Sequence, residues 1–260
     1  MAQRLPLLQA MRRVLLLVAT LAACKAASEE KPVRGRAGAR VDSSAGEVTL
    51  PQSRYTPASV ATTGRVTGSV ALQAVVVDTI TATASCAGKA PDDAALEGRI
   101  VVWIADVKQG KARPVERRTE LTSEGCDLYP VVQAVVTGTT INVFNDDKAL
   151  HRLVFTRLGT HDTLTVMPFT NSGEVVPSER LAKSPGVVEV ECAIHPRERA
   201  YITAFDSPYF AIADPSGAFT IDSVPPGAYR VMAWAPGMTK PIEATAQVAA
   251  GGSATVRLGR

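Results

Sequence analysis

The sequence predicts an all-β protein built from β-sandwiches, on three observations. Short runs rich in Val, Ile and Thr recur between Gly, Pro and Asp residues, as in "GRIVVWIADV" (98–107) and "GVVEVECAI" (186–194), and such runs are typical of strands. Long segments with the 3.6-residue apolar period of an amphipathic helix are absent. The turn sequences Asp214-Pro215-Ser216-Gly217 and Pro226-Gly227 place proline and glycine where type I and type II turns need them.

The first 23 residues have the pattern of a signal peptide. Arg12 and Arg13 precede an apolar run, residues 14–23, that is too short to span a bilayer. We therefore expect residues 1–23 to be removed and to take no part in the fold.

The end of this run, Leu21-Ala22-Ala23-Cys24, resembles the lipobox of bacterial lipoproteins. The resemblance implies that Cys24 is acylated, becomes the first mature residue and anchors the protein to a membrane through lipid. Lys25 follows the cysteine, which in that family goes with the outer rather than the inner membrane. The expected location is therefore the cell envelope, facing the periplasm. The alternative is an ordinary signal peptide with a chance cysteine.

Residues 24–63 are expected to form a flexible tether. They are rich in Ala, Ser, Gly, Pro and charge and show no sustained period. Loss of the three arginines of the leader leaves 25 basic residues against 25 acidic ones, so the mature chain has no formal net charge. This balance argues against nucleic acid as a partner and against an electrostatic hold on membranes.

The C-terminal stretch "DPSGAFTIDSVPPGAYRVMAW" (214–234) resembles the carboxypeptidase regulatory-like, transthyretin-type β-sandwich. The opening motif of that family, "G.V.G.V", is found far upstream, at residues 64–70. The resemblance therefore implies a sandwich in two parts, 64–111 and 207–260. Such an interruption is tolerated when it falls at a loop tip.

The intervening residues 112–206 are expected to form one domain, of which residues 126–206 resemble a cupredoxin. The motifs are "INVFNDDKALH" (141–151), a strand that ends in Asn-Asp and leads to a histidine, and "VECAIHPRERAYI" (190–202), a strand that leads to a cysteine and a second histidine. The implied fold is a cupredoxin-like Greek-key β-sandwich, inserted in or adjacent to the transthyretin-like sandwich. The combination resembles the plastocyanin-like proteins found near methylamine-utilisation clusters.

The cupredoxin resemblance implies a metal site. His151, Cys192 and His195 map onto the two imidazoles and the thiolate of a blue-copper centre, whose fourth ligand is weak and axial. Glu198 stands where that family has an axial methionine. A carboxylate is a hard anionic donor, so it is expected to favour Cu(II) and lower the reduction potential, or to let the site take zinc instead.

Two classes of function remain open from the sequence. The first is an envelope lipoprotein that binds copper for one-electron transfer or copper handling, with a redox protein as partner. The second is a metal-free, non-redox scaffold that docks a protein or a glycan, in which Glu198 faces solvent or pairs with Arg152, Arg197 or Arg199. The sequence does not indicate an enzyme, because Cys192 and His195 lack an oxyanion-hole motif and an orienting partner.

A disulfide between Cys86 and Cys126 is also predicted. Acylation of Cys24 would leave three cysteines in an oxidising compartment, so one stays unpaired. Three pairings are open. We favour Cys86–Cys126 because Cys192 occupies a ligand position and the other two flank the expected domain junction.

Overall fold

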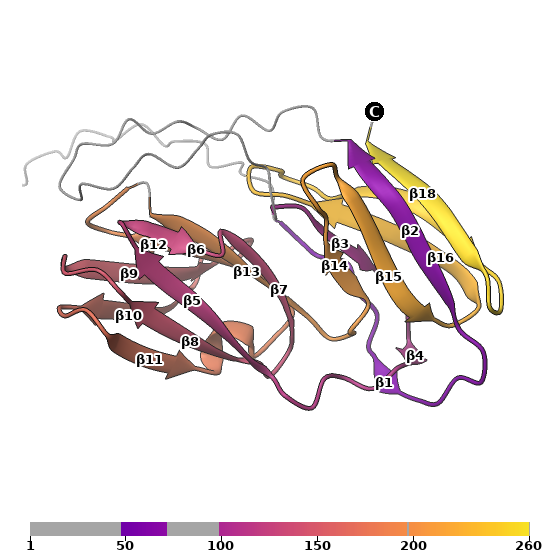
Figure 1. The fold of residues 1–260 in the computed structure, drawn as a ribbon, viewed down its shortest axis with the longest axis horizontal. Coiled ribbons are helices and arrows are strands. Elements are labelled where there is room, and N and C mark those ends of the chain that lie inside the picture. The colour runs from indigo at the N-terminus through magenta and orange to yellow at the C-terminus, as the bar shows by residue number, and fades with distance from the viewer. Residues whose placement is uncertain (1–47, 72–98, 197, 260) are drawn as a thin grey trace, which may run out of the picture. The chain divides into compact units, whose positions relative to one another are not determined.

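The computed structural model describes residues 48–71, 99–196 and 198–259 of the 260-residue chain (Figure 1). The leader expected at residues 1–23, Cys24 and Cys86 lie outside the described residues. Within these ranges the regular structure is eighteen strands and one short 3₁₀-helix, Arg180–Ala182, so the predicted all-β fold class is confirmed. None of the helical structure described is long and apolar enough to cross a membrane.

Strands between residues 118 and 205 form a two-sheet sandwich, here called the central sandwich. Its larger sheet has the order β10 (Thr163–Phe169), β9 (His151–Arg157), β12 (Gly186–Cys192), β13 (Arg199–Phe205), β7 (Val132–Val136). Its smaller sheet has the order β11 (Glu174–Ser178), β8 (Thr140–Asn145), β5 (Arg118–Glu124), β6 (Asp127–Tyr129). Neighbours in these sheets run antiparallel except for β13 with β7 and β5 with β8, which are parallel.

The core of the central sandwich follows from alternation along its strands. In β8 the side chains alternate strictly between half-buried and buried, which places Ile141 and Val143 on the inner face. In β9 the inner face carries His151, Leu153 and Phe155, each without exposed surface. Residues of both sheets meet in one apolar cluster, so His151 begins a strand whose next inward positions are core.

Strands that precede and strands that follow the central sandwich in the sequence together form a second sandwich, here called the flanking sandwich. One sheet has the order β14 (Phe210–Ile212), β3 (Val101–Ile104), β16 (Gly227–Trp234), β17 (Ile242–Val248). The other has the order β15 (Ala218–Val224), β2 (Gly64–Ala71), β18 (Ser253–Gly259). Thus β2 and β3, which precede the central sandwich, pair only with strands that follow it among the described residues.

The turn before β15 has the chemistry that its sequence predicts. Asp214 Oδ1 accepts hydrogen bonds from the backbone N–H groups of Ser216 and Ala218, and the N–H of Gly217 donates to Asp214 O. Gly217 has a φ of +82°, and a Cβ there would lie 2.3 Å from Val70 O. Glycine is therefore required both by the backbone conformation and by the close approach of β2.

Part of the stretch predicted to be a flexible tether, residues 24–63, is ordered in the structure, within residues 48–63. Leu50 and Tyr55 are only 6% and 5% exposed, and Trp103 Nε1 donates a hydrogen bond of 2.9 Å to Pro51 O. The short strand β1 (Thr56–Pro57) pairs in parallel with β4 (Gln109–Gly110). The segment from Leu50 to Pro57 is therefore held against the fold, and its few apolar residues are too widely spaced to produce a period in the sequence.

A third apolar cluster combines residues of both sandwiches. Trp103 and Trp234, from β3 and β16, pack with Tyr201 and Phe205 of β13. The Tyr201 and Trp234 rings meet edge to face at 5.8 Å, and the Trp103 and Phe205 centroids are 5.5 Å apart. Both tryptophans are thus core residues, in line with the large apolar area that an indole buries.

Candidate metal centre

His151 and Cys192 are placed by two neighbouring strands. His151 is the first residue of β9 and Cys192 is the last residue of β12, which pair antiparallel with Cys192 opposite Leu153. Side chains two positions apart on a strand share a face, so His151 and Cys192 become diagonal neighbours on the buried side of the sheet. Two residues separated by 41 positions in the sequence are thereby brought to one end of the central sandwich.

His195 and Glu198 come from the short connection between β12 and β13. Cys192 N donates to Glu198 O at 3.0 Å, and Glu198 N donates to His195 O at 3.0 Å. Ala193 N donates to Arg152 O at 2.9 Å, which ties the start of this connection to β9. These backbone bonds fold the connection back on itself, so both side chains return toward Cys192.

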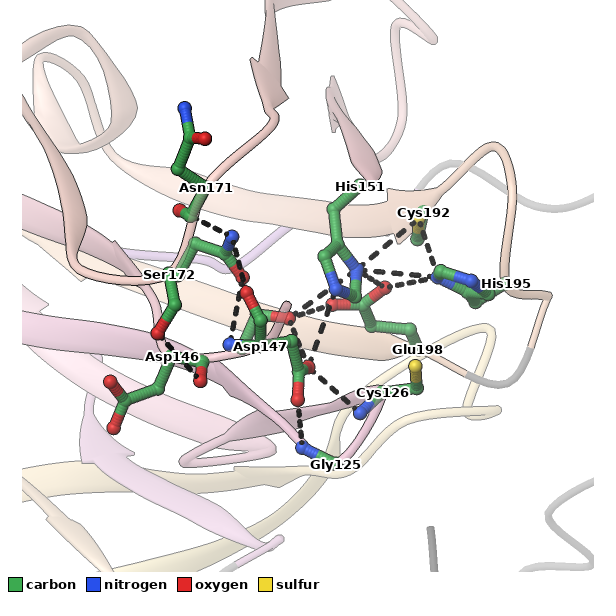
Figure 2. Close-up of polar contacts among 12 residues, drawn as sticks. Gly125, Cys126, Asp146, Asp147, His151, Asn171, Ser172, Cys192, His195 and Glu198 are labelled. Atoms are coloured by element: carbon green, nitrogen blue, oxygen red, sulfur yellow. Dashed lines mark hydrogen bonds and ion pairs between the residues drawn. The ribbon is translucent and has the colours of Figure 1, made fainter. Parts of the chain in front are cut away.

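The four side chains converge at one point (Figure 2). His151 Nδ1 lies 2.7 Å from Glu198 Oε2, 3.3 Å from His195 Nδ1 and 3.9 Å from Cys192 Sγ. His195 Nδ1 lies 3.6 Å from Cys192 Sγ and 3.4 Å from Glu198 Oε2. The structure therefore brings together all four residues that the sequence proposed as ligands.

These separations fit a metal ion with four donors. Bonds of about 2.0–2.3 Å to nitrogen, oxygen and sulfur in a tetrahedral arrangement place neighbouring donors about 3.3–3.6 Å apart. Four of the five distances lie close to that range, with His151 Nδ1 to Cys192 Sγ the longest of them. The fifth, between His151 and Glu198, is a hydrogen-bond length, so this pair must separate slightly to share a metal. A thiolate, two imidazoles and a carboxylate suit both Cu(II) and Zn(II).

The site is buried and charged. The side chains of His151 and Glu198 have no exposed surface, while that of His195 is 10% exposed. Burial lowers the pKa of His151, but hydrogen bonds and charge interactions with Cys192 and Glu198 outweigh it and raise the pKa to about 10. Burial raises the pKa of Glu198, but hydrogen bonds from His151, Ser123 and Cys192 outweigh it and lower the pKa below its usual value. Without metal, His151 and Glu198 therefore form a buried ion pair.

From the sequence, Glu198 could face solvent or pair with an arginine. In the structure it does not face solvent, and it pairs with neither Arg152 nor Arg199, the two of these arginines whose side chains are described. Glu198 is fully buried and accepts a hydrogen bond of 2.5 Å from Ser123 Oγ in addition to its contact with His151. Arg199 pairs instead with Glu189 and Glu191 on another face of the sheet. The side chain of residue 197 lies outside the described residues.

Two polar neighbours of the site, Ser123 and Asp147, are not predicted from the sequence. Ser123, on β5, contacts Glu198 and also lies 3.4 Å from His151 Nδ1. Asp147, in the loop between β8 and β9, places Oδ2 3.3 Å from His151 Nε2. Nothing in the sequence marks a serine within a strand or the second of two aspartates after "FN" as part of a site. Only their contacts with His151 and Glu198 in the folded protein identify them.

The described part of the chain contains two cysteines, of which one is a free thiol and the other is disulfide-bonded. Cys192 is free and buried, and Cys126 is disulfide-bonded. The donor atoms of Cys126, Asp147 and His151 also lie close together, but a sulfur in a disulfide does not serve as a thiolate ligand. The partner of Cys126 lies outside the described residues, so the pairing with Cys86 stays a prediction.

Comparisons with known proteins match parts of the chain. The family model for polysaccharide lyase family 4, domain II, matches residues 200–256, which leaves the carboxypeptidase regulatory-like assignment of this region a prediction. Among curated proteins nothing matches. The purple cupredoxin from Nitrosopumilus maritimus is 16% identical with a TM-score of 0.28, over 34% of this chain and 99% of its own. Amicyanin from Paracoccus versutus is 16% identical with a TM-score of 0.30, over 35% and 84%.

A larger protein is also similar in part. The Cu-containing nitrite reductase from Thermus scotoductus is 22% identical with a TM-score of 0.31, over 37% of this chain. The matched segment spans only 24% of the reductase.

Proposed function

We propose that this protein binds one copper ion at His151, Cys192, His195 and Glu198, for one-electron transfer or for copper handling, and that it is not an enzyme. The observation that carries the proposal is the convergence of these four donors within 4.8 Å of one another at one buried end of a sandwich. Bound copper would supply one-electron redox chemistry. The protein's own part is to hold the donors, exclude water and balance charge.

The framework suits a site whose ligands should move little between two oxidation states. His151 and Cys192 belong to paired strands, and the connection that carries His195 and Glu198 is fixed by backbone hydrogen bonds to its own ends. Of the two imidazoles, His151 has no exposed surface, while His195 reaches the surface with a tenth of its side chain. His195 therefore marks the face through which an electron would pass to a redox protein partner.

Glu198 is proposed as the ligand that sets the potential. Its anionic oxygen favours the higher charge of Cu(II) over Cu(I), so it lowers the reduction potential relative to a thioether in the same place. Glu198→Met should raise the potential and retain one equivalent of bound copper. An unchanged potential in this variant would show that Glu198 is not a ligand.

A second candidate function rests on a specific observation. Without metal, Glu198 already accepts hydrogen bonds from His151 and Ser123, so its buried carboxylate is satisfied within the protein. Such a cluster can stabilise a metal-free fold, in which case the protein is a non-redox scaffold that docks a protein or a glycan. Zinc held by the same four residues is the third reading of the donor set.

Metal stoichiometry separates these readings. The purified chain is treated with a chelator, titrated with Cu(II) or Zn(II), and weighed by native mass spectrometry. The copper proposal expects one tightly held copper and its loss in His151→Ala. Zinc held more tightly than copper supports the zinc reading, and no stoichiometric metal in either titration supports the scaffold.

The cellular setting is proposed from the sequence. A lipid on Cys24 would anchor the protein in the envelope, most readily at the outer membrane, with the sandwiches in the periplasm. Cys24→Ser should release the mature-sized chain from the membrane fraction, whereas continued sedimentation with membranes would contradict the anchor.

A further inference from the structure

Asp147 is held by backbone hydrogen bonds next to the proposed metal centre, on the Nε2 side of His151. Its Oδ1 accepts a hydrogen bond of 2.7 Å from Gly125 N, and its Oδ2 accepts one of 2.9 Å from Cys126 N (Figure 2). The same Oδ2 lies 3.4 Å from Ser123 Oγ and 3.3 Å from His151 Nε2. The carboxylate is 15% exposed, so it lies between the protein surface and the buried ring of His151.

The ring of His151 needs a partner on the side of Nε2. Its Nδ1 faces Glu198, His195 and Cys192, which leaves Nε2 as the second nitrogen of a ring without exposed surface. An imidazole that offers Nδ1 to a metal keeps its proton on Nε2. Nε2 has no aligned hydrogen bond in the described residues, although Asp147 Oδ2 is within ion-pair distance. At this distance of 3.3 Å, a small rotation of the ring brings the N–H onto Oδ2.

The position of Asp147 is set by backbone rather than by His151. Gly125 and Cys126 both have φ near +60°, a conformation that turns their two N–H groups toward the carboxylate. Asp147 N donates to Asn145 Oδ1, and Asn145 Nδ2 donates to Asp147 O. The carboxylate is therefore held in place before any metal arrives.

We propose that Asp147 is a positioning residue for the metal centre. Its carboxylate accepts a hydrogen bond from Nε2–H of His151, which keeps the ring proton on Nε2 and leaves Nδ1 free and more basic. The inference rests on the proposed copper function. Partners of this kind fix the tautomer and the orientation of a histidine ligand, and their loss typically weakens metal binding by roughly 10- to 100-fold.

Asp147→Asn tests the proposal, with Glu174→Gln as the matched control. Glu174 also organises a loop through backbone N–H groups, those of Thr170 and Asn171, but it contacts none of the four proposed ligands. We expect Asp147→Asn to weaken Zn(II) and Cu(II) binding by roughly tenfold or more and to raise the copper reduction potential. Glu174→Gln should leave both unchanged.

A measurement on the wild-type protein removes dependence on how the variant folds. In zinc-loaded protein with ¹⁵N-labelled histidine, the Nε2 proton of His151 should be a slowly exchanging, strongly downfield resonance. A rapidly exchanging proton, or equal metal affinity in Asp147→Asn and Glu174→Gln, would overturn the role of Asp147 while wild type still binds metal. Failure of wild type to bind either metal would overturn the proposed function and this inference together.

Discussion

Replacing Glu198 by Gln in the metal-free protein removes one charge from a buried ion pair and keeps the shape of the side chain. Breaking such a pair by removing one partner typically costs about 3–5 kcal/mol. Gln keeps an acceptor oxygen for Ser123, a hydrogen bond worth about 1 kcal/mol, and His151 is free to lose its proton. We therefore expect Glu198→Gln to lower the free energy of unfolding by about 2–3 kcal/mol at pH 6.

The effect should depend on pH in a defined direction. The pKa of His151 is raised from 6.5 to about 10, so its contribution is fully present below pH 6.5 and is lost as the pH rises through about 10. The pKa of Glu198 is lowered from 4.5, so its contribution is present above pH 4.5 and is lost as the pH falls further. The difference between wild type and variant should therefore be largest between about pH 5 and 6.5.

Urea unfolding with a chelator present, followed by tryptophan fluorescence and circular dichroism, measures this difference. Glu191→Gln is the control, because that carboxylate pairs with Arg199 at the surface, with 46% of its side chain exposed, and such pairs contribute about 1 kcal/mol or less. Glu198→Gln proteins that unfold at the same urea concentration as the control at every pH would refute the buried ion pair.

Two further predictions concern the flanking sandwich. Asp106→Asn should lower the melting temperature at pH 7 by the loss of a surface pair worth up to about 1 kcal/mol. The hydrogen bond from Arg230 is the main cause that lowers the pKa of Asp106 below 3.8, so the difference should vanish as the pH falls well below that value, and a difference that persists in acid would contradict this. Gly217→Ala should destabilise the fold by about 2 kcal/mol or more, because of its φ of +82° and the nearby Val70 O, and an unchanged urea midpoint would show that the turn adapts.

The cupredoxin resemblance predicts that His151, Cys192, His195 and Glu198 converge, and the structure brings them together. His195 and Glu198 lie in the short connection that directly follows Cys192, the last residue of β12, and His151 begins a strand with an alternating burial pattern. Their convergence needs only that β9 and β12 pair, which the cupredoxin resemblance implies.

The surroundings of the site could not be predicted in the same way. Ser123 and Asp147 act through contacts between segments that are distant or irregular, and no local pattern distinguishes them from other polar residues of strands and loops. The composition of residues 48–63 and their lack of a sustained period predict a flexible stretch, yet tertiary packing buries Leu50 and Tyr55. Periodicity detects faces of regular elements and misses single anchors of this kind.

Visible absorption on addition of one equivalent of Cu(II) tests the central claim most directly, in wild type and in Cys192→Ser. Wild type should develop an intense thiolate-to-copper charge-transfer band that saturates at one equivalent, and Cys192→Ser should show none. The account would be contradicted by wild type that binds no copper, or by a band of equal intensity in Cys192→Ser.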